Sequence, residues 1–268
     1  MTRPARHARS RWMGIAGGLA LGLGPAAPAS AHPHVWVTVE TTVLFDNGTI
    51  TGFRHKWTFD EFYTAMAIEG LDTNKDGVYS REELAELAQV NIDGLKEFGF
   101  FTHPKLGEAA LKLGAAKDFH LEHGLAERPA NVPDAPPAKD DAPQAAKPSQ
   151  GLFARLGEAV FGKPKAAAAD APVPSLSLHM TLPLEKPVLA DAEGFAFAVY
   201  DPTFFIAMDL AKGTPVKLGA GAPNGCRIDM GADDGAPKPG DAFSQIGGGI
   251  AVGFAAAKPI RVLCGSKL

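Results

Sequence analysis

The sequence predicts an α+β fold, mainly an antiparallel β-sheet or sandwich-like domain with an inserted helix–loop–helix. Hydrophobic residues alternate with a period of two after residue 35 and again after residue 175, which indicates half-buried strands. Between residues 60 and 98 the hydrophobic period becomes helical. Residues 125–174 are so rich in alanine, proline, lysine and aspartate that they cannot bury a core, so we expect a disordered insert there.

The first 31 residues have the features of a secretory signal peptide. A basic start is followed by a short apolar run that ends at Ala29-Ser30-Ala31, a small-residue cleavage site. A retained membrane anchor is disfavoured because the run is short and broken by glycine and proline. Cleavage after Ala31 predicts a periplasmic protein that begins at His32 and has no transmembrane segment.

The mature chain is expected to be acidic. Without the four arginines of the signal peptide, the 26 basic residues of the chain become 22, against 30 acidic ones. A negative net charge argues against nucleic acid and against an anionic membrane surface as partners.

Residues 32–124 are expected to form the first part of the domain and to open with a hairpin. Val35–Phe45 predicts the first strand and Thr49–Trp57 the second. A three-residue loop with Gly48 in the left-handed conformation would place the valines on the same face as Phe53, His55 and Trp57. A two-residue turn would oppose the valines with Arg54 and Lys56, which is a poorer pattern.

The segment 60–92 contains a twelve-residue stretch that matches an EF-hand calcium loop, from Asp72 to Glu83. Helices over Phe62–Leu71 and Arg81–Val90 are expected to flank it. Hard oxygen ligands at these spacings suit Ca²⁺ better than Mg²⁺. A surface turn that holds no metal is the alternative. The predicted calcium ligands are Asp72, Asn74, Asp76, Val78, Ser80 and Glu83.

Short alternations over Thr102–Glu122, with Leu111 and Leu113 before Phe119 and Leu121, suggest another hairpin. Within the low-complexity insert 125–174, residues 152–161 could form a short amphipathic helix that docks on its own domain, on a partner or on a membrane surface. Residues 175–268 are expected to complete the same β-rich domain.

The mature N-terminus is a candidate site for a transition metal. Cleavage would give His32 a free amine beside its imidazole, and His34 adds a second imidazole for Ni²⁺, Co²⁺, Zn²⁺ or Cu²⁺. Pro33 has no N–H and so excludes a site built on backbone amides. His55 is a possible third ligand, but its strand parity favours a hydrogen-bonded core histidine.

Two further groups are less specific. His120 and His123, with Glu122 between them, could line a metal site or simply end a strand. Cys226 and Cys264 predict one disulfide in an oxidising compartment, with a thiolate metal site as the alternative.

No sequence pattern supplies a nucleophile together with its base, so we predict no enzyme and no catalytic residues. The stretch from Tyr200 to Phe205 is expected to be a turn with Asp201 as its cap.

Four motifs occur in the same order in one bacterial family: the segments 32–36 and 54–62, the loop 72–83 and the segment 200–205. The chain resembles this exported family of unknown function, which carries the label of a periplasmic component of an uncharacterised ABC-type transport system. The resemblance implies an association with nickel or cobalt permeases. The expected function is a calcium-binding, transition-metal-binding accessory of such a transporter. The alternative is a non-catalytic envelope protein that calcium stabilises.

Overall fold

A computed structural model of the chain describes residues 33–129, 132, 171–203, 205–231 and 259–265. The predicted signal peptide, His32, most of the low-complexity insert and the helix expected at residues 152–161 lie outside these ranges. No helix in the described part of the chain is long and apolar enough to cross a membrane.

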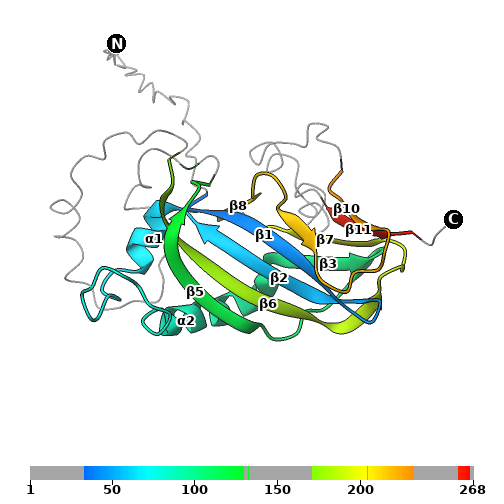
Figure 1. Ribbon diagram of the computed structural model, residues 1–268, viewed down its shortest axis with the longest axis horizontal. Helices are drawn as coiled ribbons and strands as arrows, with labels where there is room; N and C mark the ends of the chain where they lie inside the picture. Colours follow the sequence, from blue (N-terminus) through cyan, green and yellow to red (C-terminus); the bar gives the residue numbers. More distant parts are fainter. Residues whose placement is uncertain (1–32, 130–131, 133–170, 204, 232–258, 266–268) are drawn as a thin grey trace, which may run out of the picture. The chain divides into compact units, whose positions relative to one another are not determined.

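The larger sheet has the strand order β5-β6-β2-β1-β8, and β9 also pairs with β1. The strands β5, β6, β2 and β1 pair with their neighbours in antiparallel fashion. Strands β8 and β9 run parallel to β1, so the sheet is mixed. Figure 1 shows β6, β2 and β1 side by side as long strands. The strands are β1 (Val35–Asp46), β2 (Thr49–Phe59), β5 (Lys117–Ala126), β6 (Val173–Leu189), β8 (Ile206–Leu210) and β9 (Val216–Leu218).

The second sheet has the order β10-β11-β7-β3-β4 and packs against the first. Phe53 of β2 carries the contact: its ring centroid lies 4.7 Å from that of Phe197 and 6.4 Å from that of Phe195. All three side chains are fully buried. The prediction of a mainly β, two-layered domain is therefore confirmed. The strands are β3 (Thr102–Leu106), β4 (Ala109–Ala110), β7 (Phe195–Val199), β10 (Cys226–Asp229) and β11 (Ile260–Cys264).

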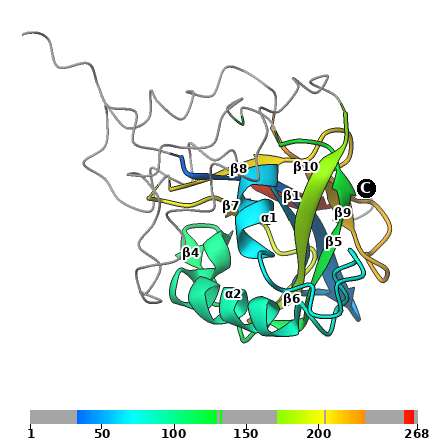
Figure 2. The same cartoon turned by 90° about the vertical axis from the view of Figure 1, so that its left-hand side faces the viewer.

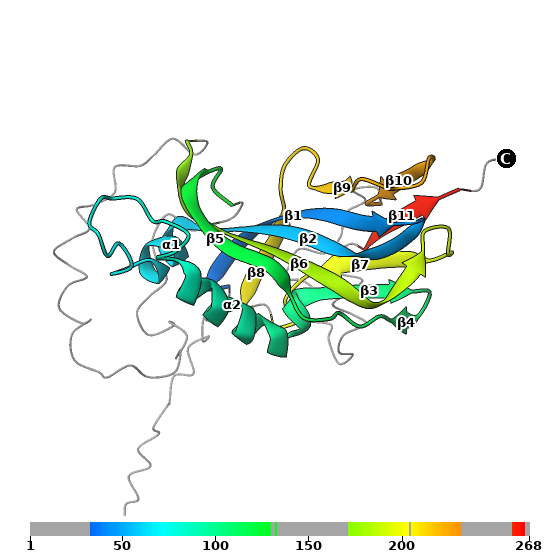
Figure 3. The same cartoon turned by 60° about the horizontal axis from the view of Figure 1, so that its bottom comes forward.

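In the described part of the chain, two helices interrupt the strands, and a short 3-10 turn at Gly99–Phe101 follows them. They are α1 (Glu61–Ala67) and α2 (Ala85–Glu97), and α2 lies beside β5 and β6 (Figures 2 and 3). The first helix is shorter than predicted because Gly70, with φ of 80°, adopts the left-handed conformation that ends helices. The second begins and ends later than predicted.

The β1–β2 hairpin has the predicted faces but not the predicted turn. Asp46 pairs with Thr49, so the loop has only two residues, Asn47 and Gly48, both with positive φ. This is the turn that the sequence disfavoured. A bulge between Leu44 and Phe45 then shifts the register, and Val43 comes to lie opposite Phe53. One extra residue in β2 thus restores the apolar face that the short turn would have lost.

The bulge brings Gly52 against β6. A Cβ atom on Gly52 would lie 2.3 Å from the carbonyl oxygen of Leu182 and 2.8 Å from the Cα of Pro183. We expect Gly52→Ala to lower the free energy of unfolding by about 1–3 kcal/mol, as overpacking does. Gly94→Ala is the control, because nothing lies within 4 Å of that position and alanine favours its helix. Urea denaturation that showed equal effects for both substitutions would contradict this account.

Residues 102–122 do not form one hairpin. Strand β3 joins β4 and β7 in the second sheet, whereas β5 pairs with β6 in the first. Leu113 makes a single bridge to Leu184 as the chain crosses between the sheets. Local alternation predicted strands here correctly but could not show that their partners lie far away in the sequence.

The two sides of the low-complexity insert are also more ordered than composition suggested. Strand β5 continues to Ala126 and β6 already starts at Val173, with Leu125 paired to Pro174. Leu125 is 74% exposed, so backbone pairing rather than burial extends the sheet here. Amino-acid composition reports on burial and not on backbone pairing, so it could not predict these strand ends.

Candidate functional site

The loop from Asp72 to Glu83 is organised by its own side chains. Asp72 accepts a hydrogen bond from the Gly77 N–H (3.0 Å), and Asp76 accepts one from the Val78 N–H (2.7 Å). Asn74 accepts another from the Asp76 N–H (2.9 Å). Gly77 has φ of 79°. The sharp turn predicted at position 6 of the loop is present, and carboxylate and amide oxygens surround it.

Glu83, at the last position of the loop, reaches back to the beginning. Its Oε1 accepts the Thr73 N–H (2.8 Å) and its Oε2 accepts the Ser80 N–H (3.0 Å). These bonds, led by the one from Ser80, lower the pKa of Glu83 to about 2. The carboxylate is therefore ionised at neutral pH, which is the form that a hard cation requires.

The structure separates His34 from His55. His55 is 1% exposed and lies on the core face of β2, with Nδ1 2.9 Å from the Thr41 hydroxyl. His34 directly precedes β1, and its ring packs against that of Phe205 in a tilted arrangement with centroids 4.8 Å apart. Because Thr41 pairs with His55, seven residues of extended chain, on the order of 23 Å, lie between the two histidines.

His55 therefore cannot share an ion with His34, and the alternative of a hydrogen-bonded core histidine is what the structure shows. Burial lowers the pKa of His55 to about 3, so the ring is neutral. His32 lies outside the described residues.

A different histidine group comes together on β5 and β6. His120 pairs directly with His179, and their rings stack with centroids 4.6 Å apart and planes 2° apart. The Nε2 of His179 lies 3.2 Å from the Oε2 of Glu122. Within the described residues, these three side chains are the one group of histidine, cysteine or carboxylate ligands whose atoms all lie within 4.8 Å of one another.

Sequence reasoning found two of the three members of this group, His120 and Glu122. It joined Glu122 to His120 and His123, but His123 pairs with Leu176 on the other face of β5. Its place is taken by His179, which lies beyond the low-complexity insert. No local spacing connects His179 to β5. Only the strand pairing does.

Burial is the main cause that lowers the pKa of both His120 and His179. The positive charge of Arg81 lowers the pKa of His120 further, and His120 itself lowers that of His179. Both effects favour neutral rings, and a neutral imidazole has the lone pair that binds metal ions.

The EF-hand-like loop 72–83 and the histidine group both contact or lie on β5. Tyr79, within the loop, packs edge-on against the ring of His123, with centroids 4.8 Å apart. Arg81, two residues further on, acts electrostatically on His120. The loop therefore contacts the strand that carries two of the three clustered side chains.

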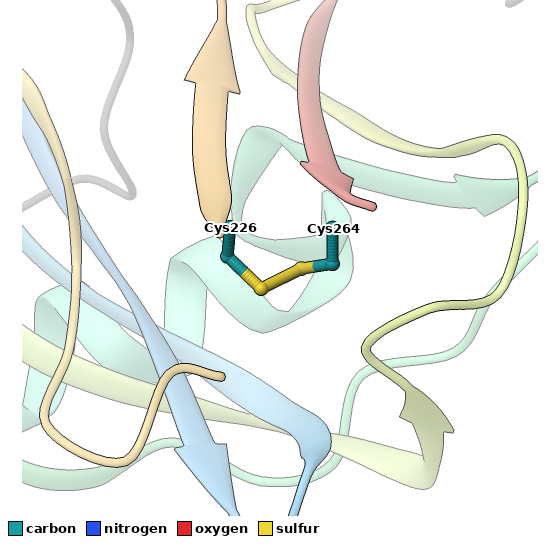
Figure 4. Close-up of a disulfide and its surroundings, with 2 residues drawn as sticks. All are labelled: Cys226 and Cys264. Carbon is teal, nitrogen blue, oxygen red and sulfur yellow. A yellow bond between two sulfur atoms is a disulfide. The ribbon is translucent and has the colours of Figure 1, made fainter. Parts of the chain in front are cut away.

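A disulfide joins Cys226 and Cys264, which are directly paired residues of β10 and β11 (Figure 4). The predicted pairing is confirmed, and the alternative of a thiolate metal site is wrong. Such a bond suits a protein from an oxidising compartment. Asp201 is a buried turn cap, as predicted, because it accepts hydrogen bonds from the N–H groups of Thr203 (2.8 Å) and Ile206 (3.0 Å).

A cavity of about 1280 Å³ opens beside the second sheet. Basic side chains line it at Lys96, Lys112 and Arg261, and His103 lies at its wall. His103 Nε2 is 3.2 Å from the carbonyl oxygen of Tyr200. Two carboxylates, Glu108 and Glu185, also line the cavity.

Comparison with known proteins gives a family without an assigned activity. The chain aligns over 206 residues with an uncharacterised protein of Haemophilus influenzae at 23% identity, covering 77% of this chain and 76% of the relative. No solved structure matches the chain. A family model described as "Protein of unknown function (DUF1007)" matches residues 18–244. The chain belongs to this family.

Proposed function

We propose that the protein is an exported, periplasmic calcium-binding protein that serves as a transition-metal-binding accessory of a metal transport system. The observation that supports it most is the loop 72–83, in which oxygen-bearing side chains occupy the ligand positions around a sharp turn at Gly77. The disulfide between Cys226 and Cys264 supports export.

Calcium is the cation that this loop suits best. Asp72, Asp76 and Glu83 supply three negative charges, and the carbonyl of Val78 and the hydroxyl of Ser80 supply neutral oxygens. Ca²⁺ takes six to eight such ligands in flexible geometry, whereas Mg²⁺ needs a tight octahedron. The Glu83 carboxylate already bonds Thr73 near the start of the loop and Ser80 near its end, so bidentate binding of Ca²⁺ by Glu83 would tie both parts of the loop to the ion.

The role of calcium is then mainly structural. The loop connects α1 to α2, and Tyr79 rests on His123 of the larger sheet. Fixing the loop therefore fixes the junction between the helices and β5. A protein in an environment rich in calcium would hold this ion permanently rather than respond to it.

Calcium is expected to raise the melting temperature of the purified protein, which is measured with a chelator and then with 1 mM CaCl₂. For a ligand at about ten to a hundred times its dissociation constant, mass action stabilises the folded state by about 1.4–2.7 kcal/mol. Glu83→Gln should weaken calcium binding at least tenfold because it removes the expected bidentate ligand.

Glu82→Gln is the matched control. Glu82 carries the same charge and is the neighbour of Glu83, but it occupies a position that does not bind the ion. Equal loss of calcium affinity in the two variants would mean that only general electrostatics acts, and the loop would not be a calcium site.

The second candidate is an envelope protein in which calcium stabilises a scaffold and no transition metal binds. The packing of Tyr79 on the sheet favours it, since that contact alone gives calcium a structural role. Melting curves separate the two functions: further stabilisation by Zn²⁺ or Ni²⁺ in calcium-saturated protein supports the accessory role, and stabilisation by calcium alone supports the scaffold.

A further inference from the structure

We propose that His120, Glu122 and His179 form a binding site for a divalent transition-metal ion on the outer face of the larger sheet. Their ligand atoms already lie within 4.8 Å of one another, and the two imidazole rings are nearly parallel. This inference deepens the proposed function, because it gives the transition-metal part a location away from His32 and His34. Its role in transport rests on that proposal, but binding itself does not.

The ligands are held by strands rather than by a loop. His120 and His179 are directly opposed residues of β5 and β6, and β6 is itself held by β2 on its other side. Glu122 follows His120 by two residues, so it shares the same face. On the opposite face, Leu121 and Leu178 are buried in the core. Such placement fixes the backbone of all three ligands before a metal ion arrives.

The chemistry of the three groups selects the class of ion. Two imidazole nitrogens and one carboxylate are the ligand set of open zinc sites, in which water completes the coordination. Metal–ligand bonds of about 2.0–2.2 Å require the three atoms to approach one another slightly, which side-chain rotation can provide. Ca²⁺ prefers an all-oxygen shell, so this site and the loop 72–83 would not compete for the same ion.

The surrounding charges limit the affinity. Lys56 lies opposite His179 across β2 and β6, and its ammonium group is 3.6 Å from a carboxylate oxygen of Glu40. The positive charge of Arg81 also acts on His120. Both cations oppose the approach of a metal ion, although Glu40 partly offsets Lys56. An open, three-ligand site in this field suits an ion that is exchanged rather than one that is locked in place.

Isothermal titration of Zn²⁺ and Ni²⁺ into calcium-saturated protein tests the site. We expect one ion to bind at the cluster and expect His120→Gln and His179→Gln each to weaken it at least tenfold. His123→Gln is the matched control, since it removes a histidine from the same strand but from the other face. Lys56→Gln should strengthen binding a few-fold because it removes a nearby positive charge.

Circular dichroism and calcium titration check that each variant is folded. If binding is unchanged in both cluster variants, the site is elsewhere and the proposal is overturned. If binding is instead lost when one residue is added before His32, the N-terminal site is responsible and the cluster is again excluded.

The two proposals fail separately. If Glu83→Gln loses calcium binding but keeps Zn²⁺ binding, the proposal of a metal site at His120, Glu122 and His179 is still supported. A protein that binds Zn²⁺ at the cluster and shows no response to calcium removes the calcium proposal alone.

Discussion

Replacing Asp60 by alanine is expected to lower the free energy of unfolding by about 3–5 kcal/mol. Asp60 is 1% exposed, and its carboxylate accepts three backbone hydrogen bonds. One oxygen accepts the N–H groups of Phe62 (2.8 Å) and Tyr63 (2.9 Å) at the start of α1, and the other accepts the N–H of Trp36 (2.9 Å) in β1. Alanine would leave these donors without partners, at about 1–3 kcal/mol for each one that stays buried.

Asp60→Asn separates the two functions of this side chain. Asparagine is a good N-cap and can keep the bonds to Phe62 and Tyr63. If its oxygen faces the helix, its amide group faces the N–H of Trp36, where donor meets donor. We therefore expect a loss between wild type and Asp60→Ala in urea denaturation. A loss below about 1 kcal/mol for Asp60→Ala would show that water replaces the carboxylate and that the link between β1 and α1 is not needed.

Acid is expected to destabilise the protein through His55. Burial lowers the pKa of His55 to about 3 in the folded state, against about 6.5 in an unfolded chain. Between pH 3 and pH 6.5, His55 is protonated in the unfolded state but stays neutral in the folded state. The stability from the neutral ring is therefore present above pH 6.5 and is lost as the pH falls toward 3. At pH 5 the loss is about 2 kcal/mol, and it approaches about 4–5 kcal/mol near pH 3.

The measurement compares the pH dependence of unfolding in the wild type and in His55→Gln. Glutamine keeps a polar group near the hydroxyls of Thr41 and Thr102 but does not titrate. The variant can be less stable at pH 7, because the readout is the slope between pH 7 and pH 5. A variant with the slope of the wild type would show that other groups cause the acid sensitivity and that His55 gains a proton in the folded state.

The hairpin shows how far the sequence predicts this fold. Alternation placed Val39 and Val43 on the face of Phe53 and Trp57, and the structure has them there because burying that face outweighs local preferences. The turn was missed because the alternation was assumed to run through the hairpin without a bulge. Asn47-Gly48 adopts its favoured two-residue geometry, and a bulge, which no side-chain pattern marks, corrects the parity.

The candidate sites also differ in whether local sequence or strand pairing brings their residues together. The loop 72–83 is contiguous, so its spacing was visible without any tertiary information. His55 could be assigned to the core by parity alone, since Phe53 and Trp57 flank it on the same face. The His120–His179 pair could not be predicted, because it depends on which strands become neighbours across a long insert whose composition carries no pairing signal.

If both proposed sites bind their ions, the contact of the loop with β5 would couple them in one thermodynamic cycle. Arg81 lies between the loop positions Ser80 and Glu83, and its charge acts on His120. If calcium draws Arg81 nearer to or farther from His120, it changes the affinity of the cluster by some factor, and a metal ion in the cluster must change calcium affinity by the same factor. Removing calcium with a chelator would then change how tightly the protein holds its second metal ion, by that same factor.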